Sequence, residues 1–200
     1  GCEIDDGFAA AHAALSVDPT IAEAHCAVAR RLEERLLFAE AKTKMETALR
    51  LDPDSWDVSK EIARVYLRDG RVAEAARYLE RAVSLMESDA QSWAKLVTCY
   101  HALGDEPRMR KAAEMAVAQA EQVLAHDQSN GAVMSFGARG YAALGEMERA
   151  KEWMERAMLI DPDNLNMRYN LACMIAVHLD ENDAAISLLE RNFANSGVLY

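Results

Sequence analysis

The residues best suited to chemistry in this 200-residue chain are five histidines and four cysteines, and their spacing indicates no catalytic or metal site. No two histidines have the H-x-x-x-H spacing of paired metal ligands on a helix, and no two cysteines form a C-x-x-C pair. We therefore expect no metal site and no disulfide framework, and we expect the cysteines in helices to pack in the core. The residues concerned are His12, His25, His101, His126 and His178, and Cys2, Cys26, Cys99 and Cys173.

The glycines in the run FGARGYAALG do not form a phosphate-binding loop. Gly137, Gly140 and Gly145 fall on an expected helix and its closing turn, not between a strand and a helix. No serine lies in the context of a nucleophile elbow, and acidic pairs such as Glu33 and Glu34 are expected on solvated helix faces. We therefore expect no catalytic residue and no cofactor, and we expect that this chain is not an enzyme.

Helices are the elements that position any functional residue, because helix formers dominate the composition. Hydrophobic residues make up 51% of the chain, with only nine glycines and four prolines. A net charge of -11 argues against nucleic-acid binding, which needs a dense basic patch. No apolar run approaches the roughly 18 residues that cross a bilayer, and no secretion signal is visible, so we expect a cytoplasmic protein.

A short turn sequence recurs and divides the chain into repeats. VDPT at 17–20, LDPDSW at 51–56 and IDPDNL at 160–165 share an Asp-Pro pair, and Pro19 and Pro53 lie 34 residues apart. Counting 34 residues forward from Pro53 reaches Glu87, and counting 34 back from Pro162 reaches Gln128. Both positions lie in expected turns without proline. Apolar residues at helical spacing place two helices in each period, for example at about 21–35 and 38–50. The predicted array has a half repeat at 1–21 with a second helix only, repeats at 22–55, 56–89, 90–130 and 131–164, and a last repeat and tail at 165–200.

Small residues recur where the helices of each pair must cross closely. The small positions are Ala29, Ala63, Ala138 and Ala172 on first helices, and Ala41, Ala75, Ala150 and Ala184 on second helices. With these alanines, the units resemble tetratricopeptide repeats. The pattern is carried by Trp93, Leu96 and Tyr100 in one unit and by Ala138, Tyr141, Gly145, Ala150, Met154, Ala157 and Pro162 in another. The resemblance implies an all-α fold, a right-handed α-solenoid of antiparallel helix pairs. Three residues depart from the pattern: Leu36 at the turn glycine, Val97 at a small position, and Arg191 in place of alanine.

The repeat at 90–130 is seven residues longer than the others, and we assign the excess to its second helix, at about 107–126. Seven residues are close to two helical turns, so the apolar stripe keeps its face. Two interpretations remain open: a lengthened core helix, or a protruding surface that contacts another domain or a second subunit. The stripe consists of Ala113, Ala116, Ala120 and Val123.

Stacked first helices of such a solenoid line an extended binding wall. The residues predicted to face it are Arg30, Lys60, Arg64, Lys95 and Arg139, with Tyr169 and Asn170 near the C-terminal end. The cations could bind carboxylates of an acidic protein or peptide segment, or they could form ordinary ion pairs with neighbouring acidic residues. The resemblance does not extend to the carboxylate clamp of chaperone-binding repeats, because Thr98, Ala132 and Phe136 occupy wall positions.

A narrower resemblance concerns residues 137–164 and 166–191. The runs GARGYAALGEMERAKEWMERAMLIDPDN and NMRYNLACMIAVHLDENDAAISLLER are similar to C-terminal repeat arrays of bacterial class III adenylate cyclase-like proteins. Together with the half repeat at the start, this resemblance implies a non-catalytic regulatory or interaction domain from a larger signalling protein. Its partners would be a protein or peptide, other domains of the parent, or a second copy bound through exposed helix ends. The alternative is a free-standing adaptor or chaperone-cofactor scaffold that binds acidic segments.

Overall fold

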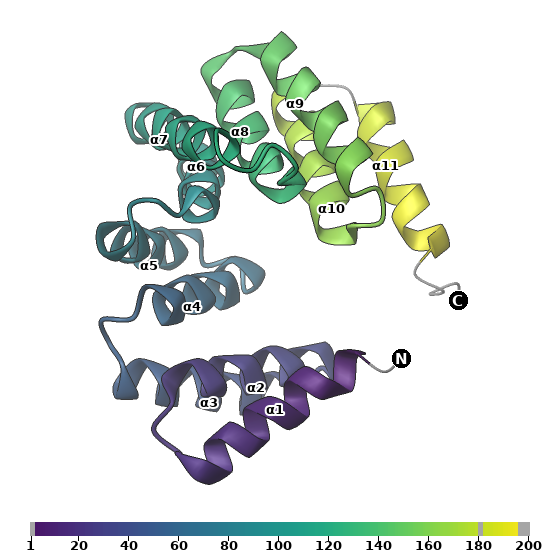
Figure 1. Cartoon of the computed structure of the whole chain (residues 1–200). Helices are drawn as coiled ribbons and strands as arrows, with labels where there is room; N and C mark the ends of the chain where they lie inside the picture. Colours follow the sequence, from purple (N-terminus) through teal and green to yellow (C-terminus); the bar gives the residue numbers. More distant parts are fainter. Residues whose placement is uncertain (1–2, 180–181, 196–200) are drawn as a thin grey trace. The chain divides into compact units, whose positions relative to one another are not determined.

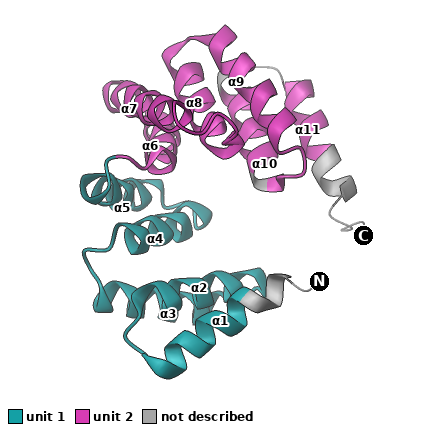
Figure 2. Cartoon of the chain, viewed as in Figure 1, with its two compact units in different colours: residues 1–87 teal, residues 88–200 magenta. Residues whose placement is uncertain are grey.

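A computed structural model describes residues 3–179 and 182–195, and within these ranges it contains helices and no strand. The chain forms two compact units, residues 1–87 and residues 88–200 (Figure 2). Their boundary lies within two residues of the predicted boundary between the repeats at 56–89 and 90–130. The all-helical prediction is confirmed.

The first unit, residues 1–87, contains two complete helix pairs and one further helix (Figure 1). Helix α2 packs against α3 and α4 against α5, while α1 packs against α2. The two first helices, α2 and α4, also contact each other. The helices are α1 (Glu3–Val17), α2 (Ala22–Glu34), α3 (Phe38–Leu51), α4 (Trp56–Arg68) and α5 (Val72–Leu85).

The second unit, residues 88–200, continues the alternation of first and second helices. Helices α6 and α10 both contact α8, so the first helices of this unit are neighbours. The elements are α6 (Ala90–Leu103), α7 (Glu106–Leu124), α8 (Gly131–Leu144), α9 (Met147–Ile160), α10 (Leu165–Met174), the π-helix η1 (Ile175–Leu179) and α11 (Asn182–Asn195).

An aspartate at the start stabilises two of the three Asp-Pro turns and one turn without proline. The carboxylate of Asp18 accepts a hydrogen bond from the backbone N–H of Thr20 at 2.8 Å, and Asp52 accepts one from Asp54 at 3.2 Å. Asp127 does the same for Ser129 at 3.1 Å, in a turn that lacks proline. An aspartate whose carboxylate accepts a hydrogen bond from the backbone N–H two residues later favours a turn over a continued helix. The aspartate therefore preserves the turn where proline is absent.

The turn from first to second helix places a residue in the left-handed region in each complete pair before α10. Gly70, Gly104 and Gly145 have φ values of 72°, 69° and 85°. Leu36 occupies the same place with φ at 62°, and its side chain is 74% exposed. A side chain with a Cβ atom is strained in this conformation. Leu36, which stands where the other repeats have glycine, therefore keeps the same backbone turn and adds strain to it.

Replacing Leu36 with glycine is expected to stabilise the first unit by about 0.5 to 1 kcal/mol, because relief of left-handed strain exceeds the added freedom of the unfolded chain. Urea unfolding followed by circular dichroism measures the change. The matched control is Leu37→Gly: Leu37 has an ordinary φ of -88°, so this change should destabilise the unit. Equal effects of the two substitutions would contradict the assignment of strain to Leu36.

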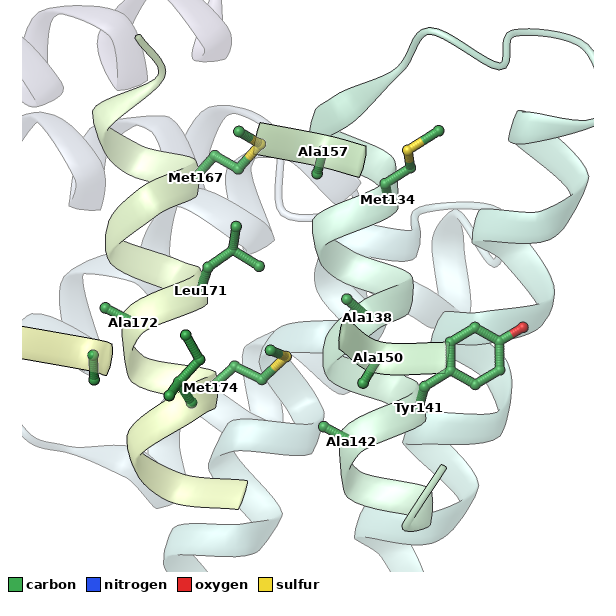
Figure 3. Close-up of a cluster of buried hydrophobic side chains, with 12 residues drawn as sticks. Met134, Ala138, Tyr141, Ala142, Ala150, Ala157, Met167, Leu171, Ala172 and Met174 are labelled. Carbon is green, nitrogen blue, oxygen red and sulfur yellow. The ribbon is translucent and has the colours of Figure 1, made fainter. Parts of the chain in front are cut away.

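The predicted small positions are buried where helices pack together. In the second unit, Met167, Leu171 and Met174 of α10 point toward α8 and its Ala138 (Figure 3). Seven of the eight predicted alanines are at most 1% exposed: Ala29, Ala41, Ala63, Ala75, Ala138, Ala150 and Ala172. Close crossings of this kind require short side chains on both helices.

The eighth predicted position, Ala184, is exposed, and the prediction for it is wrong. Ala185 is buried in its place, at 5% exposed. A π-helix, η1, follows α10 and accommodates one residue more than α-helical turns do. Helix α11 accordingly begins 35 residues after α9 rather than 34. The strict period misses this one-residue offset.

The extra length of the third complete repeat lies mainly in α7, which has 19 residues against 14 in α9. Ala113, Ala116 and Ala120 are fully buried, and α7 packs against α6 and α8. Val123 is partly buried. These three alanines are therefore unavailable to a second subunit, and the lengthened core helix is the interpretation that describes them.

Two glycines of α8 allow this packing. A Cβ atom on Gly140 would lie 2.7 Å from the Val117 side chain and 2.9 Å from the backbone oxygen of Ala113, both on α7. A Cβ atom on Gly137 would lie 2.3 Å from the Trp153 ring of α9. Gly145 ends the helix. The run FGARGYAALG is therefore a packing surface and a turn, as the prediction of helix and closing turn requires.

Candidate functional site

One surface position recurs on every first helix. It directly follows a residue that is at most 1% exposed, namely Ala29, Ala63, Val97, Ala138 or Ala172. In each unit, we call the surface that contains this position the first-helix face of that unit. The position is occupied by Arg30 and Arg64 in the first unit, and by Thr98, Arg139 and Cys173 in the second.

In the first unit, the first-helix face carries two buried carboxylates. Glu33 of α2 is 8% exposed and Glu61 of α4 is 5% exposed. Arg30 lies 2.5 Å from a Glu61 carboxylate oxygen, and Arg64 lies 2.9 Å from the other. Arg64 also lies 2.6 Å from Glu33, as does Arg68. The five side chains link α2 to α4 through ion pairs.

The pKa of Glu61 shows the balance within this cluster. Burial alone would raise it, but the charges and hydrogen bonds of Arg64 and Arg30 outweigh burial and hold the pKa below its ordinary value. Glu61 is therefore a carboxylate at neutral pH. The ion-pair alternative describes Arg30 and Arg64 in this structure.

Lys60 also has interaction partners within its own helix. Its ammonium lies 3.4 Å from an Asp57 oxygen and 4.1 Å from the centre of the Trp56 ring. The side chain is only 13% exposed. A partner that bound Lys60 would have to replace both contacts.

The second unit differs, because its central cation has neutral partners. Arg139 donates one hydrogen bond to the Thr98 hydroxyl at 3.0 Å and another to the backbone oxygen of Asn170 at 3.2 Å. Among the side chains that the structure describes, no carboxylate forms an ion pair with Arg139. Burial lowers the pKa of Arg139, and a guanidinium remains charged even so. The guanidinium links all three first helices of this unit.

The predicted aromatic residue lies beside this cation. Tyr169 is 57% exposed, and its pKa is raised, first by the charge of Cys173 and by a hydrogen bond to it, with the charge of Arg139 acting in the opposite direction. Asn170 is partly buried and contributes its backbone oxygen. Lys95 is partly buried on α6. Arg139, Tyr169 and Asn170 are therefore brought together.

The cysteines differ in environment, and this predicts their reactivity. Cys26 and Cys99 are 2% and 0% exposed, and burial, aided by the charge of Glu61, raises the pKa of the Cys26 thiol to about 12. Cys173 is partly exposed. Ellman's reagent reacts with accessible thiolates. In a Cys2→Ser variant at pH 8, it should therefore modify Cys173 first, and it should modify Cys26 and Cys99 only when the protein unfolds. The slow reaction of Cys26 and Cys99 should persist in the double variant Cys2→Ser/Cys173→Ser. Equal reaction rates for Cys26, Cys99 and Cys173 would contradict the assigned burial.

The described residues contain neither a metal-binding cluster nor a membrane-spanning helix. Among them, no group of three or more His, Cys, Asp or Glu side chains could hold a metal ion. No helix in these ranges is long and apolar enough to cross a membrane.

A hollow of about 190 Å³ lies in the first unit between α3, α4 and α5. Its apolar lining includes Met45, Leu49, Ile62 and Val65, and Tyr66 and Tyr78 also line it. The Tyr66 ring stacks on Tyr78 with 5.4 Å between ring centres. The hollow is not part of the predicted first-helix site.

Sequence reasoning missed the buried acids. Glu33 was expected on a solvated face, and that prediction is wrong, because Arg64 and Arg68 cover its carboxylate. Glu34 next to it is exposed, as expected. A usable signal was present: Arg30 and Arg64 occupy equivalent repeat positions, and Glu33 and Glu61 each lie three residues from one of them.

Comparison with known protein families agrees with the repeat pattern. Two family models, each described as tetratricopeptide repeat, match residues 37–98 and 139–164. No curated protein gives a significant match to the sequence. A relation to adenylate cyclase-like proteins is not shown by these matches and stays a prediction.

Solved structures with the same fold cover nearly all of the chain. A chain of the APC/C hetero-tetramer Cut9-Hcn1 has a TM-score of 0.66 at 16% identity, over 98% of this chain and 38% of that one. A thermophilic tetratricopeptide repeat protein of Thermus thermophilus has a TM-score of 0.62 at 19% identity, over 88% and 92%. YrrB, described as a tetratricopeptide repeat protein with an unusual peptide-binding site, has a TM-score of 0.51 at 17% identity, over 92% and 91%.

The chain therefore spans well under half of the Cut9-Hcn1 chain that it matches. At these identities the similarity establishes the fold. Helix pairs and solved structures agree on an α-solenoid fold for the described part of the chain, and residues 37–98 and 139–164 of it match tetratricopeptide repeats.

Proposed function

We propose that this chain is a non-catalytic scaffold that binds a protein or peptide segment on its first-helix face. The observation that carries the proposal is the recurrence of a polar side chain directly after a buried residue on four of the first helices, namely Arg30, Arg64, Thr98 and Arg139. Repeat solenoids expose such rows because each helix pair contacts only its neighbours. YrrB, which shares the fold, is described as having a peptide-binding site, and this supports the same class of activity here.

The partner that this face would select is an acidic segment. Arginine side chains hold carboxylates by charge-assisted hydrogen bonds, and Arg139 is an arginine of this face whose hydrogen-bond partners, the Thr98 hydroxyl and the Asn170 backbone oxygen, are neutral. The chain itself carries a net charge of -11, so a basic partner would be attracted elsewhere on the surface. Tyr169, with its exposed ring, could add an apolar contact.

A peptide selection with site-specific cross-linking tests this function. Random linear peptides displayed on phage are selected against the chain, and the enriched peptides are synthesised. Each is cross-linked to a variant with benzoylphenylalanine at Tyr169 and to a control with the same group at Glu152, which is exposed on the second helix α9. We expect peptides rich in Asp and Glu that cross-link at position 169.

Two results would oppose the proposal. Cross-linking at position 152 with none at 169 would place binding on the second helices. Failure of the selection to enrich any peptide over the input library, with correctly folded protein, would remove peptide binding as the function.

The parent protein is a second part of the proposal. The similarity of residues 137–164 and 166–191 to repeat arrays of bacterial adenylate cyclase-like proteins supports a regulatory role within a larger signalling protein. A free-standing adaptor or chaperone cofactor is the alternative. The reading frame that encodes this chain separates them: a cyclase domain in the same frame supports the regulatory role, and a frame confined to the repeats supports the adaptor.

A further inference from the structure

We infer that the acid-binding subsite lies in the second unit, where Arg139 accepts a single carboxylate of a protein segment and Tyr169 contacts the adjoining residue. This inference rests on the proposed function and names the chemistry and the location of the contact. It also excludes the first unit, although that unit has more arginines on the same face.

Charge balance separates the two units. In the first unit, Arg30, Arg64 and Arg68 surround two buried carboxylates, Glu33 and Glu61, at 2.5 to 2.9 Å. A partner's carboxylate would have to displace one that is already desolvated and paired, and it would leave that group buried without a partner. The first-unit cluster therefore connects two helices and is closed to an incoming acid.

Arg139 presents the opposite case. Its two known partners, the Thr98 hydroxyl and the Asn170 backbone oxygen, are neutral, so its positive charge is not balanced by any carboxylate in the described part of the chain. These bonds also fix the guanidinium between α6 and α10 before any ligand arrives. A guanidinium has five N–H donors, so hydrogens remain for an incoming oxygen. Such preorganisation lowers the cost of binding.

The charge of the site favours a carboxylate over a phosphate group. Arg139 supplies one positive charge, which a carboxylate matches, whereas a phosphate monoester carries about -1.5 to -2 near neutral pH. The side chain of Tyr169 is 57% exposed next to the cation. Its ring offers an apolar surface to the residue beside the bound acid. A segment in which Asp or Glu adjoins a hydrophobic residue fits both features.

Fluorescence anisotropy with defined peptides tests the inference on the full chain. The probe is a fluorescein-labelled peptide of repeated Gly-Leu-Glu, and the comparison peptides carry Gln or phosphoserine in place of Glu. We expect the Glu peptide to bind more tightly than both. Arg139→Gln should weaken its binding by roughly tenfold, which corresponds to the loss of one charge-assisted contact.

The matched control is Arg30→Gln, at the equivalent position of the first unit. Its side chain is 54% exposed, but its charge is already paired with Glu61. Binding of the Glu peptide should change by less than about twofold in this variant, since no ligand contact is removed. Because Arg139→Gln could perturb packing, the arginine Nε–H resonance of Arg139 is also followed in the unsubstituted protein during titration.

The outcomes are decisive in either direction. A selective shift of the Arg139 resonance, with the loss confined to Arg139→Gln, supports the inference. Equal weakening by both variants, tighter binding of the phosphoserine peptide, or no binding of the Glu peptide overturns it. Failure of the peptide selection and of cross-linking at position 169 would instead remove the proposed function itself.

Discussion

Replacing Gly140 with alanine is expected to destabilise the second unit by about 2 kcal/mol, although alanine is the better helix former. Helix propensity alone would stabilise α8 by about 1 kcal/mol. The new Cβ atom, however, would lie 2.9 Å from the backbone oxygen of Ala113 and 2.7 Å from Val117. Since a backbone atom cannot rotate away, α7 and α8 must separate, and overpacking costs about 3 kcal/mol.

Urea unfolding of the full chain, followed by circular dichroism and by hydrogen exchange of α7 and α8, measures this loss. Gly7→Ala is the matched control, because Gly7 lies within α1, is exposed, and its Cβ atom would meet only an Arg31 nitrogen at 3.6 Å. That substitution should stabilise α1 by about 0.5 to 1 kcal/mol. A stabilising Gly140→Ala substitution would show that α7 and α8 are not packed this closely.

Replacing Glu61 with glutamine is expected to destabilise the first unit by about 2 kcal/mol. Removing one partner from a fully buried ion pair costs roughly 3 to 5 kcal/mol. Here Glu61 is 6% exposed at its side chain, but Arg30 and Arg64 are 54% and 31% exposed, so water compensates part of the loss. Hydrogen exchange of α2 and α4 during urea titration measures the effect where it arises.

The control is Glu34→Gln, because Glu34 forms an exposed pair with Arg31 at 2.7 Å. Exposed pairs of this kind contribute less than about 1 kcal/mol. Equal losses in the two variants would show that the buried cluster contributes no more than a surface pair.

The effect of Glu61 should also depend on pH. A carboxyl whose pKa is lowered on folding stabilises the folded state above its unfolded pKa, and this contribution is lost as the pH falls through the folded pKa. The stability difference between the unsubstituted chain and Glu61→Gln should therefore be constant near neutrality and shrink below about pH 4. A difference that persisted at pH 2 would indicate a packing defect.

The fold follows closely from the sequence because helix pairs, turns and small residues repeat together. The alanine positions from Ala29 to Ala172 could be predicted since each lies one period from another, and burial requires a short side chain at each crossing. Ala184 could not, because the extra residue of η1 leaves no mark in the spacing of the turns.

The site was less accessible to prediction, since a period places a residue on a face but does not reveal what its charge contacts. Arg64 and Arg139 occupy equivalent positions, yet the first lies against two carboxylates and the second against a hydroxyl and a backbone oxygen. That distinction depends on neighbours from other helices. It is the reason for proposing Arg139, and not Arg64, as the ligand contact.

The insertion in the third complete repeat has a consequence for protein engineering. Thr98 and Arg139 are 41 residues apart instead of 34, yet their side chains still meet at 3.0 Å. Five of the added residues lengthen α7 beyond the 14 of α9, and the remainder extend the following turn. An insertion confined to a second helix and the turn after it can thus lengthen one repeat while the side chains on the neighbouring first helices still meet. The end of α7 and the turn after it are therefore a natural place to graft or excise sequence.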